Sequence, residues 1–230
     1  MECLPYGRPE AVIGSPLYPK GSERARPTAH VGDFKVQTGK DVLRKRLRER
    51  RRSLSSRESA RLGGVIARFA IALPDYARSR SIGVYHPIDH EVDPHPLVVH
   101  AVAVNKKVSL PVTDVGKGRM GFVAWRPEDP LVAGPFGTRQ PRWSGDVRLL
   151  VAKGALDCIF LPMVGFDRQG WRLGYGGGYF DRYLAADTGE NPCLVGLAYS
   201  FQEVETILAE PHDCRLHYVI TERGVTRFPG

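Results

Sequence analysis

The chain has 230 residues, of which 42% are hydrophobic and 25% charged, and its formal net charge is +8. This composition is typical of a globular protein, and no window approaches the roughly 18 unbroken apolar residues of a membrane-spanning helix, so we expect a soluble protein. The positive charge is local, because residues 1–60 carry 14 Lys/Arg against 7 Asp/Glu whereas residues 61–230 carry 19 against 18.

The N-terminal residues and the cysteines bear on the domain organisation and the cellular compartment of the protein. Residues 1–37 are rich in Pro, Gly, Arg and Ser without periodicity, so we expect a disordered extension followed by one domain over residues 38–230. The cysteines are widely spaced, with no Cys-x-x-Cys pair and no secretory leader, which favours the reducing cytoplasm and neither zinc nor a disulfide framework. They are Cys3, Cys158, Cys193 and Cys214.

Two helices are predicted at the start of the domain. Thr38 and Asp41 form a capping-box pattern, followed by an apolar stripe on a strongly basic helix. A second capping box, Ser55 with Glu58, begins another helix, which Pro74 ends. The apolar positions of the second helix are Leu62, Val65, Ile66, Phe69 and Leu73.

Short apolar runs alternate with helical segments along the rest of the chain. Strands are predicted at 81–85, 107–110, 120–125, 156–161, 193–199 and 218–221, with helices from Asp93-Pro94 to Val104 and over 179–186. A long connection punctuated by Pro and Gly covers 127–145. Strand–helix–strand order predicts an α/β fold of three layers, with a mostly parallel twisted sheet flanked by helices.

The segment Arg172 to Arg182, RLGYGGGYFDR, has the features of a phosphate site. Four glycines free the backbone, and the residues that follow favour a helix, so that backbone N–H groups and a helix N-terminus could hold an anion. Asp181 offers a hard oxygen for magnesium. The spacing matches neither a Walker A loop nor the dinucleotide-binding pattern, and a flexible surface turn is the alternative.

A second polar region and the basic helix allow several interpretations. The run from Arg44 to Arg52 could be a solvated helix face, an anion site using selected members, or a nucleic-acid surface. His86 to His95 gathers three histidines and three acids after a strand, where open α/β sheets place ligands. Its spacing fits no standard zinc site, and a single acid such as Glu91 that accepts from substrate donors is the better functional hypothesis.

Together these residues resemble the 5-formyltetrahydrofolate cyclo-ligase family, also called 5,10-methenyltetrahydrofolate synthetases. The resemblance runs from Lys40 to Arg227 and rests on three ordered motifs: K-x-x-L-R at Lys40, LPMVGFDRQGWRLGYGGGYFDR from Leu161, and HD...VITE from His212. It implies conversion of 5-formyltetrahydrofolate into 5,10-methenyltetrahydrofolate, with ATP as co-substrate, Mg²⁺ as cofactor, and ADP and phosphate as products. ATP would phosphorylate the formyl oxygen, which N10 then displaces.

The resemblance also implies site residues. Contacts to ATP would come from Lys40, Arg44, Arg172, Leu173, Gly174, Tyr175, Gly176, Gly177, Gly178, Tyr179 and Phe180, with Arg172 and Tyr179 catalytic. Contacts to the folate would come from Arg44, His86, Glu91, Tyr175, Gly176, Gly177, Gly178 and Tyr179. Asp181 matches one magnesium ligand. The partners implied are these small molecules, without nucleic acid or membrane, for a monomer or weak dimer.

One position departs from the family pattern. His217 stands where the family has a second acid, and a neutral imidazole is a poor ligand for magnesium. Asp213 or water could replace that acid, Asp181 and ATP could hold the ion alone, or activity could be weakened. A divergent relative that binds nucleotide or folate without this activity, and a nucleic-acid-binding module using residues 44–52, are the alternatives.

Overall fold

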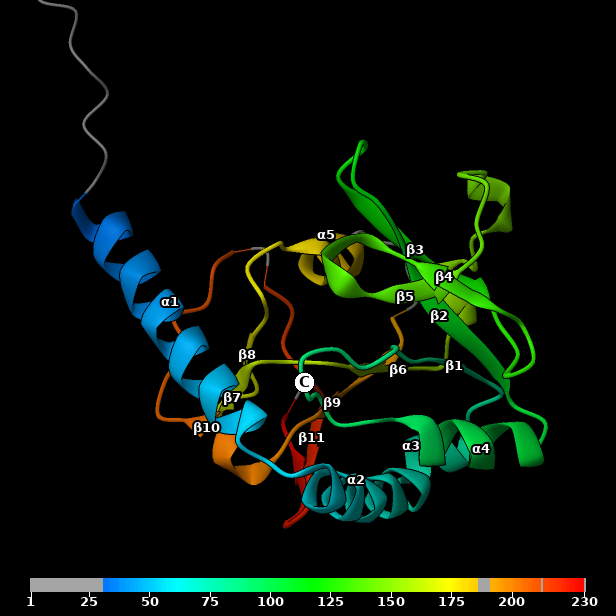
Figure 1. The fold of residues 1–230 in the computed structure, drawn as a ribbon, viewed down its shortest axis with the longest axis horizontal. Coiled ribbons are helices and arrows are strands. Elements are labelled where there is room, and N and C mark those ends of the chain that lie inside the picture. The colour runs from blue at the N-terminus through cyan, green and yellow to red at the C-terminus, as the bar shows by residue number, and fades with distance from the viewer. Residues whose placement is uncertain (1–30, 186–190, 212, 230) are drawn as a thin grey trace, which may run out of the picture.

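A seven-stranded sheet forms the centre of the molecule, with the strand order β12-β11-β9-β6-β1-β2-β3 (Figure 1). The computed structural model describes residues 31–185, 191–211 and 213–229, with side chains from residue 39 onward. Neighbouring parallel strands are β2 (Lys107–Asp114), β1 (Ser81–Gly83), β6 (Cys158–Leu161), β9 (Cys193–Leu197) and β11 (Tyr218–Thr221). At one edge, β3 (Arg119–Ala124) pairs antiparallel with β2, and at the other edge β12 (Gly224–Arg227) pairs antiparallel with β11. The predicted mostly parallel sheet is confirmed.

Helices cover both faces of this sheet, as predicted. In Figure 1, α2 (Ser56–Ile71), α3 (Pro74–Arg78) and α4 (His95–Ala103) lie below the strands, and α5 (Tyr179–Ala185) lies above them. Alternate residues of β6 pack on opposite sides: Phe160 joins the core under α2 and α4, whereas Leu161 joins the core under α5. No described helix is long and apolar enough to cross a membrane.

The first two helices test the predicted capping boxes. Ser55 caps α2 as predicted, because its Oγ accepts from the Glu58 backbone N–H at 3.2 Å. In contrast, α1 (Val31–Arg52) begins before Thr38, so the predicted start is wrong and residues 31–37 are helical. No proline interrupts residues 31–37, and a capping residue does not prevent a helix from running through it. The rest of the predicted disordered extension lies outside the described residues.

A smaller sheet joins α1 to the body of the protein. It contains β7 (Gly165–Asp167), β8 (Arg172–Leu173) and β10 (Glu203–Val204), with the order β10-β7-β8. Leu47 of α1 packs with Leu173 in a separate small core. Gly165 permits this close approach, because a Cβ there would lie 2.8 Å from the Leu47 Cδ1 atom.

The connection between β3 and β6 carries structure that the sequence pattern did not predict. A hairpin of β4 (Leu131–Ala133) and β5 (Arg139–Pro141) has the 3₁₀ turn η1 (Pro135–Gly137) at its tip. Three further 3₁₀ turns are η2 (Val147–Leu149), η3 (Lys153–Ala155) and, after β9, η4 (Ser200–Gln202).

Candidate active site

The glycine segment connects β8 to the N-terminus of α5 and faces α1. Gly176 and Gly178 have φ values of 99° and 62°, a left-handed conformation that favours glycine. The Arg44 guanidinium lies over this turn, since a Cβ on Gly176 would be 3.5 Å from the Arg44 Cζ atom. Arg44 Nε also donates to the Gly174 carbonyl oxygen at 2.9 Å. The predicted loop and one predicted cation of α1 are therefore in direct contact.

Lys40 precedes Arg44 by one helical turn and lies on the same side of α1. Its Nζ forms an ion pair with Glu210 Oε1 at 2.7 Å, and its side chain is 15% exposed. Arg44 additionally pairs with Asp41 at 2.6 Å. The chain itself thus supplies carboxylate partners to both predicted ATP-contacting cations.

Arg172 holds the other side of the glycine segment. Its side chain is 4% exposed and donates to the Cys214 carbonyl oxygen at 2.8 Å and to Asp181 Oδ1. Asp181, the predicted magnesium ligand, is consequently an ion-pair partner of the predicted phosphate-binding arginine. In the part of the chain that the structure describes, no group of three or more His, Cys, Asp or Glu side chains is placed to hold a metal ion.

His217, the position that departs from the family pattern, is bound by the backbone of β9. Its Nδ1 accepts from the Leu194 N–H at 2.8 Å. Burial lowers the pKa of His217, and nearby Asp75 of α3 opposes this effect. The Nδ1 atom of His217 is therefore already occupied by a backbone donor, and Asp75 is the charge that acts on the imidazole.

Asp213 precedes Cys214, and its Oδ2 accepts from the Glu210 N–H at 2.8 Å. Burial raises the pKa of the Cys214 thiol, Arg172 opposes that rise, and the charges of Asp181 and Asp213 add to it. Both carboxylates therefore act on the same thiol, next to the Arg172 guanidinium.

Three arginines of α1 converge on Asp89. Arg48 Nε donates to Asp89 Oδ2 at 2.7 Å, Arg51 Nη2 reaches the same oxygen at 3.1 Å, and Arg52 pairs with Oδ1. Burial alone would raise the pKa of Asp89, but the hydrogen bonds from Arg48 and Arg52 outweigh it and lower the pKa. Asp89 and His90 adopt φ values of 48° and 58°, so the backbone is left-handed at this clamp.

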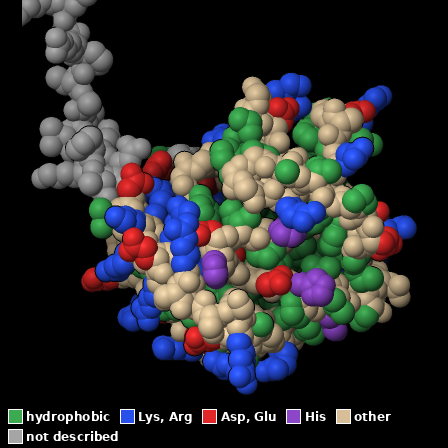
Figure 2. All heavy atoms as spheres, in the orientation of Figure 1, with side chains coloured by type: hydrophobic (Ala, Val, Ile, Leu, Met, Phe, Trp, Pro, Cys, Tyr) green, Lys and Arg blue, Asp and Glu red, His purple; other side chains and the backbone are tan. Residues whose placement is uncertain are grey.

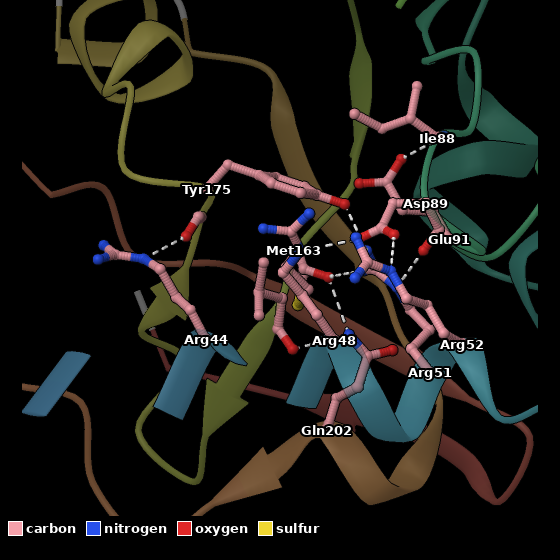
Figure 3. Close-up of polar contacts among 12 residues, drawn as sticks. Arg44, Arg48, Arg51, Arg52, Ile88, Asp89, Glu91, Met163, Tyr175 and Gln202 are labelled. Carbon is pink, nitrogen blue, oxygen red and sulfur yellow. Dashed lines mark hydrogen bonds and ion pairs between the residues drawn. The ribbon is translucent and has the colours of Figure 1, made fainter. Parts of the chain in front are cut away.

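Arg51 is a site residue that the sequence did not single out. It is 1% exposed and donates to the Asp89 carbonyl oxygen at 2.7 Å, to the Met163 carbonyl oxygen at 3.2 Å and to the Tyr175 hydroxyl. Figure 3 shows Tyr175 reaching from the glycine segment to the group formed by Arg51, Asp89 and Glu91. A buried arginine thus ties the glycine segment to the polar loop after β1.

Glu91 combines deep burial with an unsatisfied acceptor. It is 5% exposed; its Oε2 accepts from the Ile88 N–H at 3.0 Å, but the buried Oε1 has no hydrogen-bond partner among the described residues. Burial raises the pKa of Glu91 to about 7, although the Ile88 N–H and Arg51 act in the opposite direction. A buried carboxylate oxygen without a partner is costly, and a ligand N–H donor would satisfy it.

The second predicted folate contact of this loop is partly buried. His86 Nδ1 is also a buried atom for which the described chain offers no hydrogen-bond partner. Two unsatisfied polar atoms therefore belong to one short segment after β1. This is the end of the parallel sheet where the sequence analysis expects a ligand.

An aromatic contact outside the predicted set borders the start of α5. Phe136, at the tip of the β4–β5 hairpin, is 66% exposed, with its ring centroid 5.5 Å from that of Tyr179. Its φ of 60° is unusual for a bulky residue, and the Arg182 guanidinium lies 4.8 Å from the Tyr179 centroid. Only an exposed aromatic residue in a Pro/Gly-rich loop could have signalled this contact in the sequence.

The basic run of α1 divides between the site and the surface. Arg44, Arg48, Arg51 and Arg52 have intramolecular hydrogen-bond partners, whereas Lys45, Arg46 and Arg50 are exposed. In the space-filling view, basic side chains lie over α1 at the left, interspersed with acidic ones (Figure 2). This mixture of charges supports selected anion contacts better than a nucleic-acid surface.

A cavity of about 670 Å³ lies elsewhere, between the end of α1, α2 and the β11–β12 turn. Arg50, Phe201 and Glu222 are among its lining residues, and none of the predicted ATP- or folate-contacting residues is. The candidate site is therefore the open region between α1, the glycine segment and the loop after β1, rather than this cavity.

Comparisons with known proteins agree with this arrangement. Residues 36–222 match the model of the 5-formyltetrahydrofolate cyclo-ligase family. The 5-formyltetrahydrofolate cyclo-ligase of Escherichia coli K12 is 31% identical over 180 residues, covering 78% of this chain and 98% of that protein. The mouse protein of the same name is 30% identical over 194 residues, covering 81% and 95%.

A solved structure shows the same fold. The Aquifex aeolicus 5,10-methenyltetrahydrofolate synthetase superposes with a TM-score of 0.69 at 32% identity, covering 83% of this chain and 93% of that one. The family match spans most of the chain, and sequence and fold agree. This chain belongs to the 5-formyltetrahydrofolate cyclo-ligase family.

Proposed function

We propose that this protein is an ATP- and Mg²⁺-dependent 5-formyltetrahydrofolate cyclo-ligase that forms 5,10-methenyltetrahydrofolate, ADP and phosphate. The observation that carries the proposal is the unsatisfied Glu91 Oε1, buried beside Tyr175 of the glycine segment. Burial and the nearby Glu91 charge raise the pKa of Tyr175, and this proximity of Glu91 to the glycine segment supports an acid for a folate ring next to a loop for phosphates. A kinase-like transfer to a folate needs these two sites side by side.

The nucleotide would bind along the glycine segment. Residues 175–177 are exposed just before α5, so their backbone N–H groups would be available to phosphates, and Arg44 and Arg172 flank them with positive charge. ATP phosphates would compete with Asp41 for Arg44, with Glu210 for Lys40 and with Asp181 for Arg172. Residues Leu173, Tyr179 and Phe180 would complete the nucleotide contacts.

The folate would bind on the other side of Tyr175. Glu91 would accept from N–H donors of the pterin ring through Oε1, with His86 at the rim and Arg44 reaching from the nucleotide side. The Arg51 and Asp89 pair would keep Tyr175 and the Glu91 loop at a fixed separation. Tyr175 and Tyr179 would therefore form the wall between the two substrates.

The magnesium site is proposed from the donor chemistry. Mg²⁺ binds one or two carboxylates together with phosphate oxygens and water, and Asp181 and Asp213 are two carboxylates whose charges both act on the Cys214 thiol. They fit the ion, whereas the His217 imidazole, whose Nδ1 accepts from the Leu194 N–H, does not. The ion would supply neutralisation of the ATP phosphate charge.

The reaction needs positioning and charge neutralisation more than a protein nucleophile. The formyl oxygen attacks the γ-phosphorus, ADP leaves, and N10 then closes the ring while the phosphate departs with the former formyl oxygen. Arg172, buried and fixed by the Cys214 carbonyl, would stabilise the transferred phosphoryl group. Tyr179, held between Phe136 and Arg182, would align that group at the start of α5.

A direct assay tests this function. Purified protein with Mg-ATP and 5-formyltetrahydrofolate should develop the near-ultraviolet absorbance of the methenyl product and release ADP in equal amount. Omission of ATP, and the variant Arg172→Met, serve as controls. A folded protein that yields no product would refute the activity, and retained nucleotide or folate binding would then support the non-catalytic relative.

The proposal also covers the domain organisation, the oligomeric state and the cellular location of the protein. We propose that residues 38–230 act as one domain in the cytoplasm, as a monomer or weak dimer. The widely spaced cysteines support a reducing compartment. Sedimentation of the full chain with and without substrates measures the oligomeric state directly.

A further inference from the structure

Two cysteines meet across the central sheet, away from the candidate active site. Cys158 of β6 and Cys193 of β9 are register partners on neighbouring parallel strands. In-register side chains of adjacent strands point to the same face, and both cysteines belong to the core region under α2 and α4. Strands about 4.8 Å apart fall within the Cα separation of about 4.4 to 6.8 Å that a disulfide bridges.

The two thiols differ in access. Cys158 is fully buried, with an exposed fraction of 0%, whereas Cys193 is partly exposed. Cys193 lines a cavity of about 280 Å³ together with Asp75, Arg78 and Asp157. A small polar oxidant could therefore reach Cys193 but not Cys158.

The hydrogen bond between the two thiols favours the thiolate at Cys193. A hydrogen bond from the Cys158 thiol lowers the pKa of Cys193; burial and Asp75 oppose this, and Arg227 and Arg78 reinforce it. The same hydrogen bond, followed by burial, raises the pKa of Cys158. An accessible thiolate beside a buried thiol is the arrangement in which one sulfur is oxidised and the other resolves it.

The pair lies at the end of the sheet opposite the candidate active site. The strands β6 and β9 begin with these cysteines, whereas Glu91 lies beyond the end of β1, and β6 leads from its other end through β7 and β8 to the glycine segment. Cys214, near Arg172 and Asp181, is on the α5 side. Oxidation of Cys158 and Cys193 is thus separate from the substrate contacts proposed above.

We propose that Cys158 and Cys193 form a peroxide-reactive thiol pair that closes to an intramolecular disulfide. The Cys193 thiolate attacks a hydroperoxide oxygen, the O–O bond breaks, and the sulfur becomes a sulfenic acid as the peroxide is reduced to water or an alcohol. The Cys158 sulfur then attacks the Cys193 sulfur, the S–O bond breaks, and hydroxide leaves with the Cys158 proton as water. A dithiol reductant reverses the bond by thiol exchange.

Hydrogen peroxide titration of the full-length reduced protein tests the pair. Differential alkylation and peptide mass spectrometry should find Cys193 reacting at least about tenfold faster than Cys214, and a Cys158–Cys193 crosslinked peptide should accumulate. Dithiothreitol should restore both thiols. In Cys158→Ser, the crosslink should vanish and a sulfenic acid at Cys193 should become trappable by dimedone.

Matched variants separate this chemistry from accidental oxidation. Cys193→Ser should abolish the fast reaction, and Cys3→Ser should leave it unchanged. Oxidation of the folded wild-type protein that goes first to Cys214, or that yields only disulfides through Cys3, would overturn the proposal. Because the wild-type alkylation pattern needs no substitution, poor folding of a variant leaves the test intact.

Discussion

Arg172 donates a hydrogen bond to the Asp181 carboxylate, so the predicted phosphate-binding cation neutralises the predicted magnesium ligand in the protein alone. Lys40 and Glu210, and Arg44 and Asp41, repeat the same arrangement around the glycine segment. Bound ATP would bring negative charge to all three cations and release carboxylates toward the metal. We therefore expect nucleotide and Mg²⁺ to bind cooperatively, because each removes a competitor of the other.

Asp181→Asn should depress catalysis through the metal. The substitution removes a carboxylate that magnesium would use and leaves Arg172 without its charged partner, so we expect kcat to fall by about 10- to 100-fold with a higher Mg²⁺ requirement. Turnover measured across Mg²⁺ concentrations at saturating ATP checks this. Glu128→Gln, on an exposed turn, is the control, and kinetics equal to wild type in Asp181→Asn would remove this residue from the metal site.

Asp213→Asn, rather than a change at His217, should alter the magnesium dependence. His217 Nδ1 accepts from the Leu194 N–H, and Asp75 is the charge that acts on this imidazole. We expect His217→Asn to shift the Mg²⁺ half-saturation less than about twofold, and Asp213→Asn to raise it by about tenfold. Titration of Mg²⁺ at fixed ATP compares the two, and the reverse order would place the metal at His217.

The sequence predicted the architecture well because its signals are local. Ser55 and Glu58 marked the start of α2, and continuous apolar runs such as Cys158–Leu161 marked buried strands. The start of α1 was wrong because residues 31–37 contain no proline, and the capping pattern at Thr38 does not stop a helix that runs through it. Helix α3 was missed because Pro74 reads equally well as the end of one helix and the first residue of another.

Some residues of the candidate site could also be predicted from the sequence, and others could not. Lys40, Arg44, Glu91 and the glycine segment stood out through spacing and family resemblance, and the structure brings Arg44 onto the segment. Arg51 was hidden within a run of arginines, because only the fold shows which of them is buried. Phe136 was hidden because its contact with Tyr179 links segments that are distant in sequence.

Arg51→Met should destabilise the fold and disturb both substrate sites. The variant leaves the Asp89 carbonyl oxygen and the Tyr175 hydroxyl without this donor and the Met163 carbonyl oxygen with Gln202 alone, so we expect a loss of about 3 kcal/mol in the free energy of unfolding. Urea denaturation measures it. Arg50→Met is the control, since exposed Arg50 only stacks on Phe201 and should cost less than about 1 kcal/mol. Equal losses in the two variants would contradict a special role for Arg51.

Glu91→Gln should change how stability depends on pH, because burial raises the pKa of Glu91 from 4.5 to about 7. The folded state holds the proton more tightly than the unfolded chain, so wild-type stability contains a cost that is absent below pH 4.5, grows as pH rises toward 7 and is complete above it. The full cost is about 3 kcal/mol. Glutamine does not titrate, so the stability of the variant relative to wild type should increase by that amount between pH 4 and pH 8.

Urea denaturation at several pH values measures this relative stability, and Glu49→Gln, an exposed change on α1, is the matched control. Parallel pH curves for wild type and Glu91→Gln would contradict the raised pKa.

Activity should move in the opposite sense to stability, because the ionised Glu91 that weakens the fold is the form that accepts from folate donors. We therefore expect kcat/KM for the folate to fall in wild type as pH drops through about 7 and to be low at every pH in Glu91→Gln. A carboxylate that lowers the stability of the fold and is required for substrate binding behaves as a site residue rather than as a structural residue.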